Sequence, residues 1–500
     1  MSTTTEHGLR GQLWRRKPIV RVQQRGDDGL TRSLTTFQLM MFGVGATVGT
    51  GVFFVMHEAV PDAGPAVVLS FLLAGVAAGL SALSYAEMAS AVPVSGSTYS
   101  YAYATLGEVV AVGVAACLLL EYGVSTAAVA VGWSGYLNQL LGNLTGWQVP
   151  DALSAGPFAE QPGLVNLPSV VLVVLCAVLL IRGASESARV NAVMVVIKLA
   201  VLGLFVAIAF TAFQADNFAD FAPQGAGGVT LAAGTIFFTF IGLDAVSMAG
   251  DEVRDPQRSM PRAILGALVI VTSIYVLVAV AALGTQPWEA FSDPEQARAG
   301  LARILEDVTG QSWPGTVISA GAVISIFSVT LVVMYGQTRI LFAIGRDGLL
   351  PRRFARVNPR THTPVQNTVV VAIVVGLLAA FVPLDSLWDL VSIGTLVAFV
   401  VVSVGVIVLR RRSPDLPRGF RMPAYPVTPV LAIAACVYIL AGLHWYTYAW
   451  FLLWLAVCVT FYLLWGRLHS ALEAAATRAG APASDPPPEP LPLDEDGGRR

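Results

Sequence analysis

Charge is scarce in this chain. Only 12% of its 500 residues are Asp, Glu, Lys or Arg, whereas soluble domains carry roughly 25%, and 55% of its residues are hydrophobic. This balance is typical of a polytopic membrane protein, so we predict an all-α protein embedded in a lipid bilayer. The net charge of −2 carries no information about partners. We expect no nucleic-acid partner.

Motifs for catalysis, metal binding and disulfide formation are also missing. The sequence contains no HExxH motif, no P-loop and no paired set of Cys and His. Its four cysteines, Cys117, Cys176, Cys436 and Cys458, lie within apolar runs, and we interpret them as small buried hydrophobic residues. We therefore expect no enzyme activity, no cofactor and no metal. The polar N-terminus has no short apolar region followed by a cleavage site, so no removable signal peptide is expected.

Apolar runs of about 20 residues, long enough to cross a bilayer as helices, recur along the chain. We predict twelve transmembrane helices at residues 36–58, 65–91, 102–130, 166–183, 190–213, 229–249, 262–284, 315–343, 365–382, 388–409, 427–443 and 447–466. They form one membrane domain, residues 36–466, which follows a basic tail of residues 1–35. The last segment, residues 467–500, ends rich in Pro and acidic residues and is expected to be disordered.

Basic residues are distributed unevenly between the predicted loops. The N-terminal tail and most even-numbered connections are rich in Lys and Arg, whereas the odd-numbered connections hold only Arg298 and Arg303. Because cytoplasmic loops carry the excess of basic residues, we predict that both termini are cytoplasmic. Residues 285–314, which contain these two arginines, are expected to include a short amphipathic helix over the outer face.

The first predicted span contains an unusual glycine-rich stretch, GVGATVGTGVF, at residues 43–53. Each glycine costs about 1 kcal/mol relative to alanine inside a helix. Thr50 lies between Gly49 and Gly51, which favours a locally unwound backbone. Unpaired backbone groups at membrane depth are tolerated only where they are buried in protein or line a wet cavity, so this break predicts a binding site.

A second interruption is predicted in span 6, where Gly242 and Asp244 follow the apolar run GTIFFTFI. Breaks in spans 1 and 6 are five spans apart, a spacing that indicates two inverted repeats of five helices. The repeats would cover residues 36–213 and 229–409, and two extra helices would occupy residues 427–466.

The two breaks together could form a clamp for an amino acid. The N–H groups of Gly49, Thr50 and Gly51 open a half-helix whose positive dipole end favours a carboxylate. Free carbonyls near Thr47, and near Phe238 and Ile241 in span 6, could accept hydrogen bonds from an ammonium group. The alternative is that the glycines only allow close packing of helices.

Lys198 is the most unusual charged residue, because it lies deep in the apolar sequence of span 5. Burial disfavours its charge, whereas carbonyls of the first break would favour it, so Lys198 could take up and release a proton during transport. The alternative is a lysine that extends to the headgroups. Ser325 and Ser328 in span 8 could face the core, where a sodium site would use such hydroxyls. An ammonium in that space would replace sodium, which favours proton coupling.

Three of the carboxylates within predicted spans are candidates for a role. Glu121 in span 3 and Asp244 in span 6 could take part in proton coupling or substrate binding, or could be neutral hydrogen-bond donors between helices. Glu87, near the cytoplasmic end of span 2, is interpreted as a gate residue or a structural ion-pair partner.

Four sequence motifs resemble those of the amino acid–polyamine–organocation superfamily, most closely its cationic amino acid transporter branch. They are LTTFQLMMFGVGATVGTGVF, SYAEMASAVPVSGSTYSYAYATLGE, FFTFIGLDAVSMAGDEVRDPQRSMPRAI and GQTRILFAIGRDGLLP. The resemblance covers residues 33–466 and implies a LeuT-like fold with broken helices 1 and 6. It also implies that Lys198 replaces a sodium ion and that Ile326 limits the side-chain pocket. Asp244 could instead pair with a basic substrate.

The sequence therefore predicts a proton-coupled L-amino acid permease of the cell membrane that works by alternating access. Neutral substrates are slightly favoured over cationic ones. A sodium-independent exchanger or uniporter of cationic amino acids or amines is the first alternative, and a sensor or channel is the second. The sequence leaves the oligomeric state open.

Overall fold

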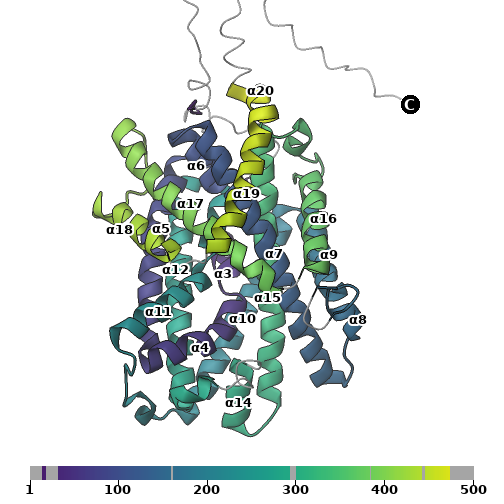
Figure 1. The fold of residues 1–500 in the computed structure, drawn as a ribbon, viewed down its shortest axis with the longest axis vertical. Helices are drawn as coiled ribbons and strands as arrows, with labels where there is room; N and C mark the ends of the chain where they lie inside the picture. The colour runs from purple at the N-terminus through teal and green to yellow at the C-terminus, as the bar shows by residue number, and fades with distance from the viewer. Residues whose placement is uncertain are drawn as a thin grey trace, which may run out of the picture.

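The chain folds into a bundle of helices (Figure 1). The computed structural model describes residues 14–17, 32–158, 162–292, 300–382, 384–441 and 445–472. Within these ranges the regular structure is helical, apart from one isolated parallel bridge between Leu34 and Val253. Most of the N-terminal tail and most of the C-terminal segment 467–500 lie outside the described residues.

A helix lies at each range where the sequence predicts a span. The first half of the chain contains α3 (Thr36–Thr47), α4 (Thr50–Ala63), η1 (Gly64–Ala66), α5 (Val67–Ala91), α6 (Ser97–Thr105), α7 (Glu108–Thr145), α8 (Asp151–Ser154), α9 (Leu167–Arg182), α10 (Ala184–Ala209), η2 (Phe210–Ala212) and η3 (Ala215–Phe218). The second half contains α11 (Gly225–Phe237), η4 (Phe238–Phe240), η5 (Leu243–Glu252), α12 (Pro256–Thr285), η6 (Trp288–Ser292), α14 (Leu301–Thr309), α15 (Trp313–Arg346), η7 (Arg352–Ala355), α16 (Val365–Phe381), α17 (Leu384–Arg412), α18 (Val427–Ala441), α19 (Trp445–Phe461), η8 (Tyr462–Gly466) and α20 (Arg467–His469).

Many of these helices are suited to a bilayer. Within the described ranges, seven stretches are long and apolar enough to cross a membrane: Val55–Ala91, Glu108–Thr145, Ala184–Ala212, Pro256–Thr285, Trp313–Arg346, Ile393–Arg412 and Thr447–His469. The apolar helices α9, α11, α16 and α18 are shorter. The prediction of a helical, multi-pass membrane protein is confirmed. The arrangement as two inverted repeats within residues 36–466 stays a prediction.

The third predicted span, residues 102–130, differs from the structure at both ends. Gly107 has a φ of 120°, which separates α6 from α7, so α7 begins at Glu108. At the other end the apolar run stops near residue 130, but the helix continues to Thr145 and ends at Gly146, whose φ is 71°. Helix α7 is 38 residues long, about 57 Å. Hydropathy therefore located this helix but not its ends.

The interior of the bundle is formed around α15, which is in contact with α3, α7, α10 and α16. In Figure 1, α6 and α20 lie at one end of the bundle, and α4 and α14 lie at the other. The expected amphipathic helix in residues 285–314 is represented by α14, which packs on α15 and α10 and buries Leu301, Ile304 and Leu305. Part of that stretch, residues 293–299, lies outside the described residues.

Candidate functional site

The first span is broken at its glycine-rich stretch, as predicted. Helix α3 ends at Thr47, and Val48 then leaves the helical region with a ψ of 85°. Gly49 follows with φ −123° and ψ −138°, and α4 begins at Thr50. The first N–H groups of a helix have no intrahelical partner, so the N–H groups of Thr50 and Gly51 begin a half-helix at this break. The Gly49 N–H donates to the Thr47 carbonyl over 2.9 Å, so in this conformation it is already engaged.

The glycines of this stretch also allow close approach of neighbouring helices. A Cβ at Gly49 would lie 2.7 Å from Val329 of α15, and one at Gly51 would lie 2.8 Å from Thr239 of η4. A Cβ at Gly45 would lie 2.8 Å from the Asn191 side chain of α10. The packing interpretation and the break interpretation are therefore not exclusive, because the same residues serve both.

Lys198 points from α10 directly at this break. Its ammonium donates to the Gly45 carbonyl at 3.0 Å and to the Val48 carbonyl at 2.5 Å, and its side chain is fully buried. The Ser325 hydroxyl donates to the same Val48 carbonyl at 2.8 Å. The interpretation of Lys198 as a lysine that extends to the headgroups is therefore wrong. The ammonium satisfies carbonyls that the interrupted helix leaves without intrahelical partners.

The second break lies beside the first. Helix α11 ends at Phe237, the short turn η4 follows, and Gly242 with a φ of 103° separates it from η5. A Cβ at Gly242 would lie 2.9 Å from the Ala46 carbonyl, so the two breaks are nearly in contact. Phe238 and Ile241, predicted to supply carbonyls, therefore lie in the interrupted segment next to the first break.

Tyr275 of α12 connects the two broken segments. Its hydroxyl lies 2.9 Å from the Thr47 carbonyl and 3.0 Å from the Thr239 carbonyl. Thr47 O therefore accepts from both Tyr275 and Gly49 in this conformation. An ammonium ligand at Thr47 would have to displace or share one of these partners.

Asp244 lies just after the second break, at the start of η5. Its Oδ2 accepts a 2.6 Å hydrogen bond from the Tyr122 hydroxyl of α7, and it is buried. Among the described residues, its Oδ1 has no hydrogen-bond partner. Asp244 therefore offers one free carboxylate oxygen in the interior next to the broken segment.

The structure places Glu121 and Ile326 differently relative to the breaks. Glu121 is buried where α7 meets α17, because a Cβ built at Gly394 of α17 would lie 3.2 Å from the Cβ of Glu121. Among the described residues, no contact between Glu121 and Lys198 is seen. Ile326 is fully buried on α15, directly after Ser325, which contacts the first break. Ile326 is thus near the first break, whereas Glu121 lies at the contact of α7 with α17 and its carboxylate interacts electrostatically with that of Asp244 beside the second break.

Ion pairs join η5 to α15 at the end of the bundle where α6 and α20 lie. Arg339 pairs with Glu252 at 2.7 Å, with both side chains buried, and Arg346 pairs with Asp251 at 3.1 Å. These two ion pairs hold the end of η5, and with it the end of the sixth span, against α15.

Residues of the N-terminal tail contact the same end. Lys17 pairs with Asp347 at 2.7 Å, and the Glu108 N–H donates to the Arg15 carbonyl. Glu87 is buried and pairs with Arg410 at 2.6 Å, which confirms its interpretation as an ion-pair partner.

Three residues of the site were missed by sequence analysis: Tyr275, Tyr122 and Asn191. Asn191 donates to the Met41 carbonyl of α3 at 3.0 Å and accepts from Ser328 at 2.7 Å, which confirms that Ser325 and Ser328 both face the interior. In the sequence, each of these three residues appears only as a polar side chain within an apolar run. That signal does not tell which helix the group faces.

Interrupted helices in a bundle of long apolar helices define a class of multi-pass membrane protein. Comparison with known sequences identifies the family. The chain matches the amino acid permease family over residues 34–465 and belongs to it. The predicted superfamily is thereby confirmed, and the family consists of transporters rather than enzymes.

Relatives along nearly the whole chain support this assignment. A branched-chain amino acid permease of Bacillus subtilis is 42% identical over 469 residues, which cover 93% of this chain and 100% of the relative. A methylthioribose transporter of the same species is 39% identical and covers 92% of this chain and 99% of the relative. Human cationic amino acid transporter 4 is 35% identical over 78% of this chain and 62% of the relative.

Proposed function

We propose that this protein is a secondary active transporter that carries L-amino acids across the cell membrane by proton symport. The observation that carries the proposal is the break at Val48 and Gly49, where the buried ammonium of Lys198 holds two backbone carbonyls. Family membership supports transport of small molecules. The break brings backbone N–H donors and C=O acceptors together at one place. The substrate carboxylate would bind the N–H groups of Thr50 and Gly51. The ammonium group of the substrate would bind carbonyls of the sixth span.

Proton coupling would arise at Lys198. Its charge is stabilised only while the carbonyls of Gly45 and Val48 remain within hydrogen-bond distance, because a buried and unpaired ammonium is strongly disfavoured. Movement of α3 away from α10 would break both contacts and favour proton release. Substrate binding at the same break would oppose that movement, so proton and substrate would travel together.

The wider architecture follows the same proposal. Spans 1 to 5 and 6 to 10 would form LeuT-like inverted repeats, with both termini in the cytoplasm. Closure of the end that holds the pairs Arg339–Glu252 and Arg346–Asp251 would then block the cytoplasmic path, and their separation would open it. Alternating access requires such a reversible barrier.

Two observations bear on the substrate. Fully buried Ile326 near the break disfavours a long basic side chain, and a relative named as a branched-chain amino acid permease agrees with neutral substrates. The unpartnered Oδ1 of Asp244 favours a cationic amino acid or amine, as do relatives named as cationic amino acid transporters. We favour neutral amino acids, because Ile326 adjoins the residue that contacts the break, whereas Asp244 is already bound to Tyr122.

Uptake into proteoliposomes tests this function. Purified protein is reconstituted with an acidic exterior and an alkaline interior, and labelled leucine, arginine and methylthioribose are compared. Accumulation of leucine that requires the pH gradient and no internal amino acid supports symport. Uptake that requires internal counter-substrate indicates an exchanger, and saturable binding without accumulation indicates a sensor. Preferred accumulation of arginine would contradict the neutral preference.

A further inference from the structure

A groove opens on the outer surface of the bundle between α3 and α10, away from the candidate transport site. It encloses about 390 Å³ and is lined by Phe37, Gln38, Arg189, Ala192, Val193, Val196 and Ile197. The five residues from α10 are spaced i, i+3, i+4, i+7 and i+8, so they form one helix face. Phe37 and Gln38 supply the facing wall from the start of α3.

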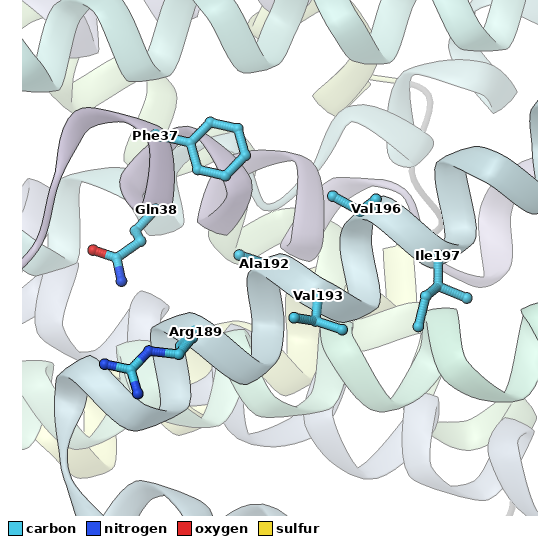
Figure 2. A pocket seen from close by; sticks show the side chains of 7 residues that line it. All are labelled: Phe37, Gln38, Arg189, Ala192, Val193, Val196 and Ile197. Carbon is cyan, nitrogen blue, oxygen red and sulfur yellow. The ribbon is translucent and has the colours of Figure 1, made fainter.

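The groove is polar at one end and apolar along the rest. Figure 2 shows the polar ends of Arg189 and Gln38 extending toward the same side, with the apolar side chains following α10 away from them. Phe37, Val193 and Val196 are exposed by 53%, 56% and 54%. Such exposed apolar residues on a membrane protein face lipid, so the groove is suited to an amphiphile rather than to a water-soluble ligand.

Arg189 has the position and charge of a headgroup contact. It lies five residues into α10, about 7.5 Å along the helix from its start at Ala184. It is exposed, and no ion pair of Arg189 is seen among the described residues. Its acidic neighbour Glu186 lies over the start of the helix, since a Cβ at Gly183 would be 2.2 Å from the Glu186 carboxylate. No residue lining the groove is acidic.

The geometry points to a binding site for one anionic phospholipid in this groove. The phosphate would bind the Arg189 guanidinium and the Gln38 amide, because guanidinium groups bind phosphate in a bidentate manner. One acyl chain would lie over Val193, Val196 and Ile197 against Phe37. Basic pockets between membrane helices near the cytoplasmic surface bind anionic headgroups for this reason.

A lipid in this groove would connect α3 to α10 from outside the bundle. Lys198 and Asn191 connect the same two helices from inside, through the carbonyls of Gly45, Val48 and Met41. An anionic lipid would therefore stabilise the arrangement in which α3 lies against α10. This binding is independent of what the protein transports.

Lipid titration of the full chain in detergent, followed by native mass spectrometry, tests the site. Phosphatidylglycerol and phosphatidylcholine with identical acyl chains are compared. We expect one phosphatidylglycerol to bind about fivefold more tightly, the factor that corresponds to about 1 kcal/mol for one basic residue near the membrane surface. Arg189→Gln should remove this preference. Phosphatidylglycerol should also raise the thermal denaturation midpoint of the wild type but not of Arg189→Gln.

Two further variants make the test specific. Arg182→Gln removes another exposed arginine at the end of α9, outside the groove, and should keep the preference. Ala192→Leu fills the groove floor and should weaken binding of both lipids. Equal binding of the two lipids by the wild type would overturn the proposal. So would an equal loss of preference in Arg182→Gln and Arg189→Gln, which would indicate only general attraction to surface charge.

Discussion

Replacing Lys198 with methionine keeps a long flexible side chain in α10 and removes the group that holds the first break. The ammonium bonds to Gly45 and Val48 are lost, whereas Ser325 still donates to the Val48 carbonyl. Hydrogen bonds to a charged group contribute about 1.5–3 kcal/mol each, but removing a buried charge also removes its desolvation cost. The variant should therefore fold, and its defect should lie in coupling.

The size of that defect follows from the driving force. One pH unit corresponds to about 1.4 kcal/mol per proton, so a symporter that moves one proton per substrate can accumulate substrate about tenfold at that gradient. Without a proton at Lys198, Lys198→Met should bring internal and external substrate only to equal concentrations. We expect exchange of labelled for unlabelled substrate to persist at a reduced rate.

The assay compares reconstituted wild type, Lys198→Met and Ser325→Ala at a gradient of one pH unit. Ser325→Ala removes a neighbouring donor to Val48 but keeps the ammonium, so it should retain accumulation and serves as the matched control. Protein orientation and amount are measured in each preparation. Tenfold accumulation by Lys198→Met would refute the assignment of coupling to this residue.

Three further substitutions probe the breaks and the pocket. Tyr275→Phe leaves the carbonyls of Thr47 and Thr239 without this donor, and we expect a lower thermal denaturation midpoint from a loss of about 1–3 kcal/mol. Gly51→Ala places a Cβ 2.8 Å from Thr239 Cγ2 and should lower stability by about 1–3 kcal/mol and weaken substrate binding. Ile326→Ser should widen the pocket, so longer or basic amino acids should compete better for uptake.

Each of these predictions has an outcome that would contradict it, and Gly51→Ala also has a control variant. Gly135→Ala adds a Cβ in open space on α7 and should neither lower stability nor weaken binding, so an equal loss in Gly51→Ala and Gly135→Ala would contradict close packing at the break. An unchanged midpoint in Tyr275→Phe would mean that its hydroxyl does not bridge the two segments. An unchanged competition profile in Ile326→Ser would remove that residue from the pocket.

Sequence alone located the parts of this protein whose cause is local. Apolar runs indicated the helices, because a bilayer accepts only segments that satisfy their own backbone hydrogen bonds. Glycines at 49 and 242 indicated the breaks, because glycine adopts backbone conformations that other residues avoid. A lysine in an apolar helix indicated a site, because a charge at that depth needs a partner.

The partners themselves were decided only by the tertiary structure. Lys198 could have faced lipid or the interior, and the packing of α10 against α3 directs it to the carbonyls of Gly45 and Val48. Tyr275 is a single tyrosine in an apolar run, and only the crossing of α12 with both broken segments turns it into a bridge. Contacts between residues far apart in sequence depend on how the helices are oriented. The order of polar and apolar residues along one helix does not specify that orientation.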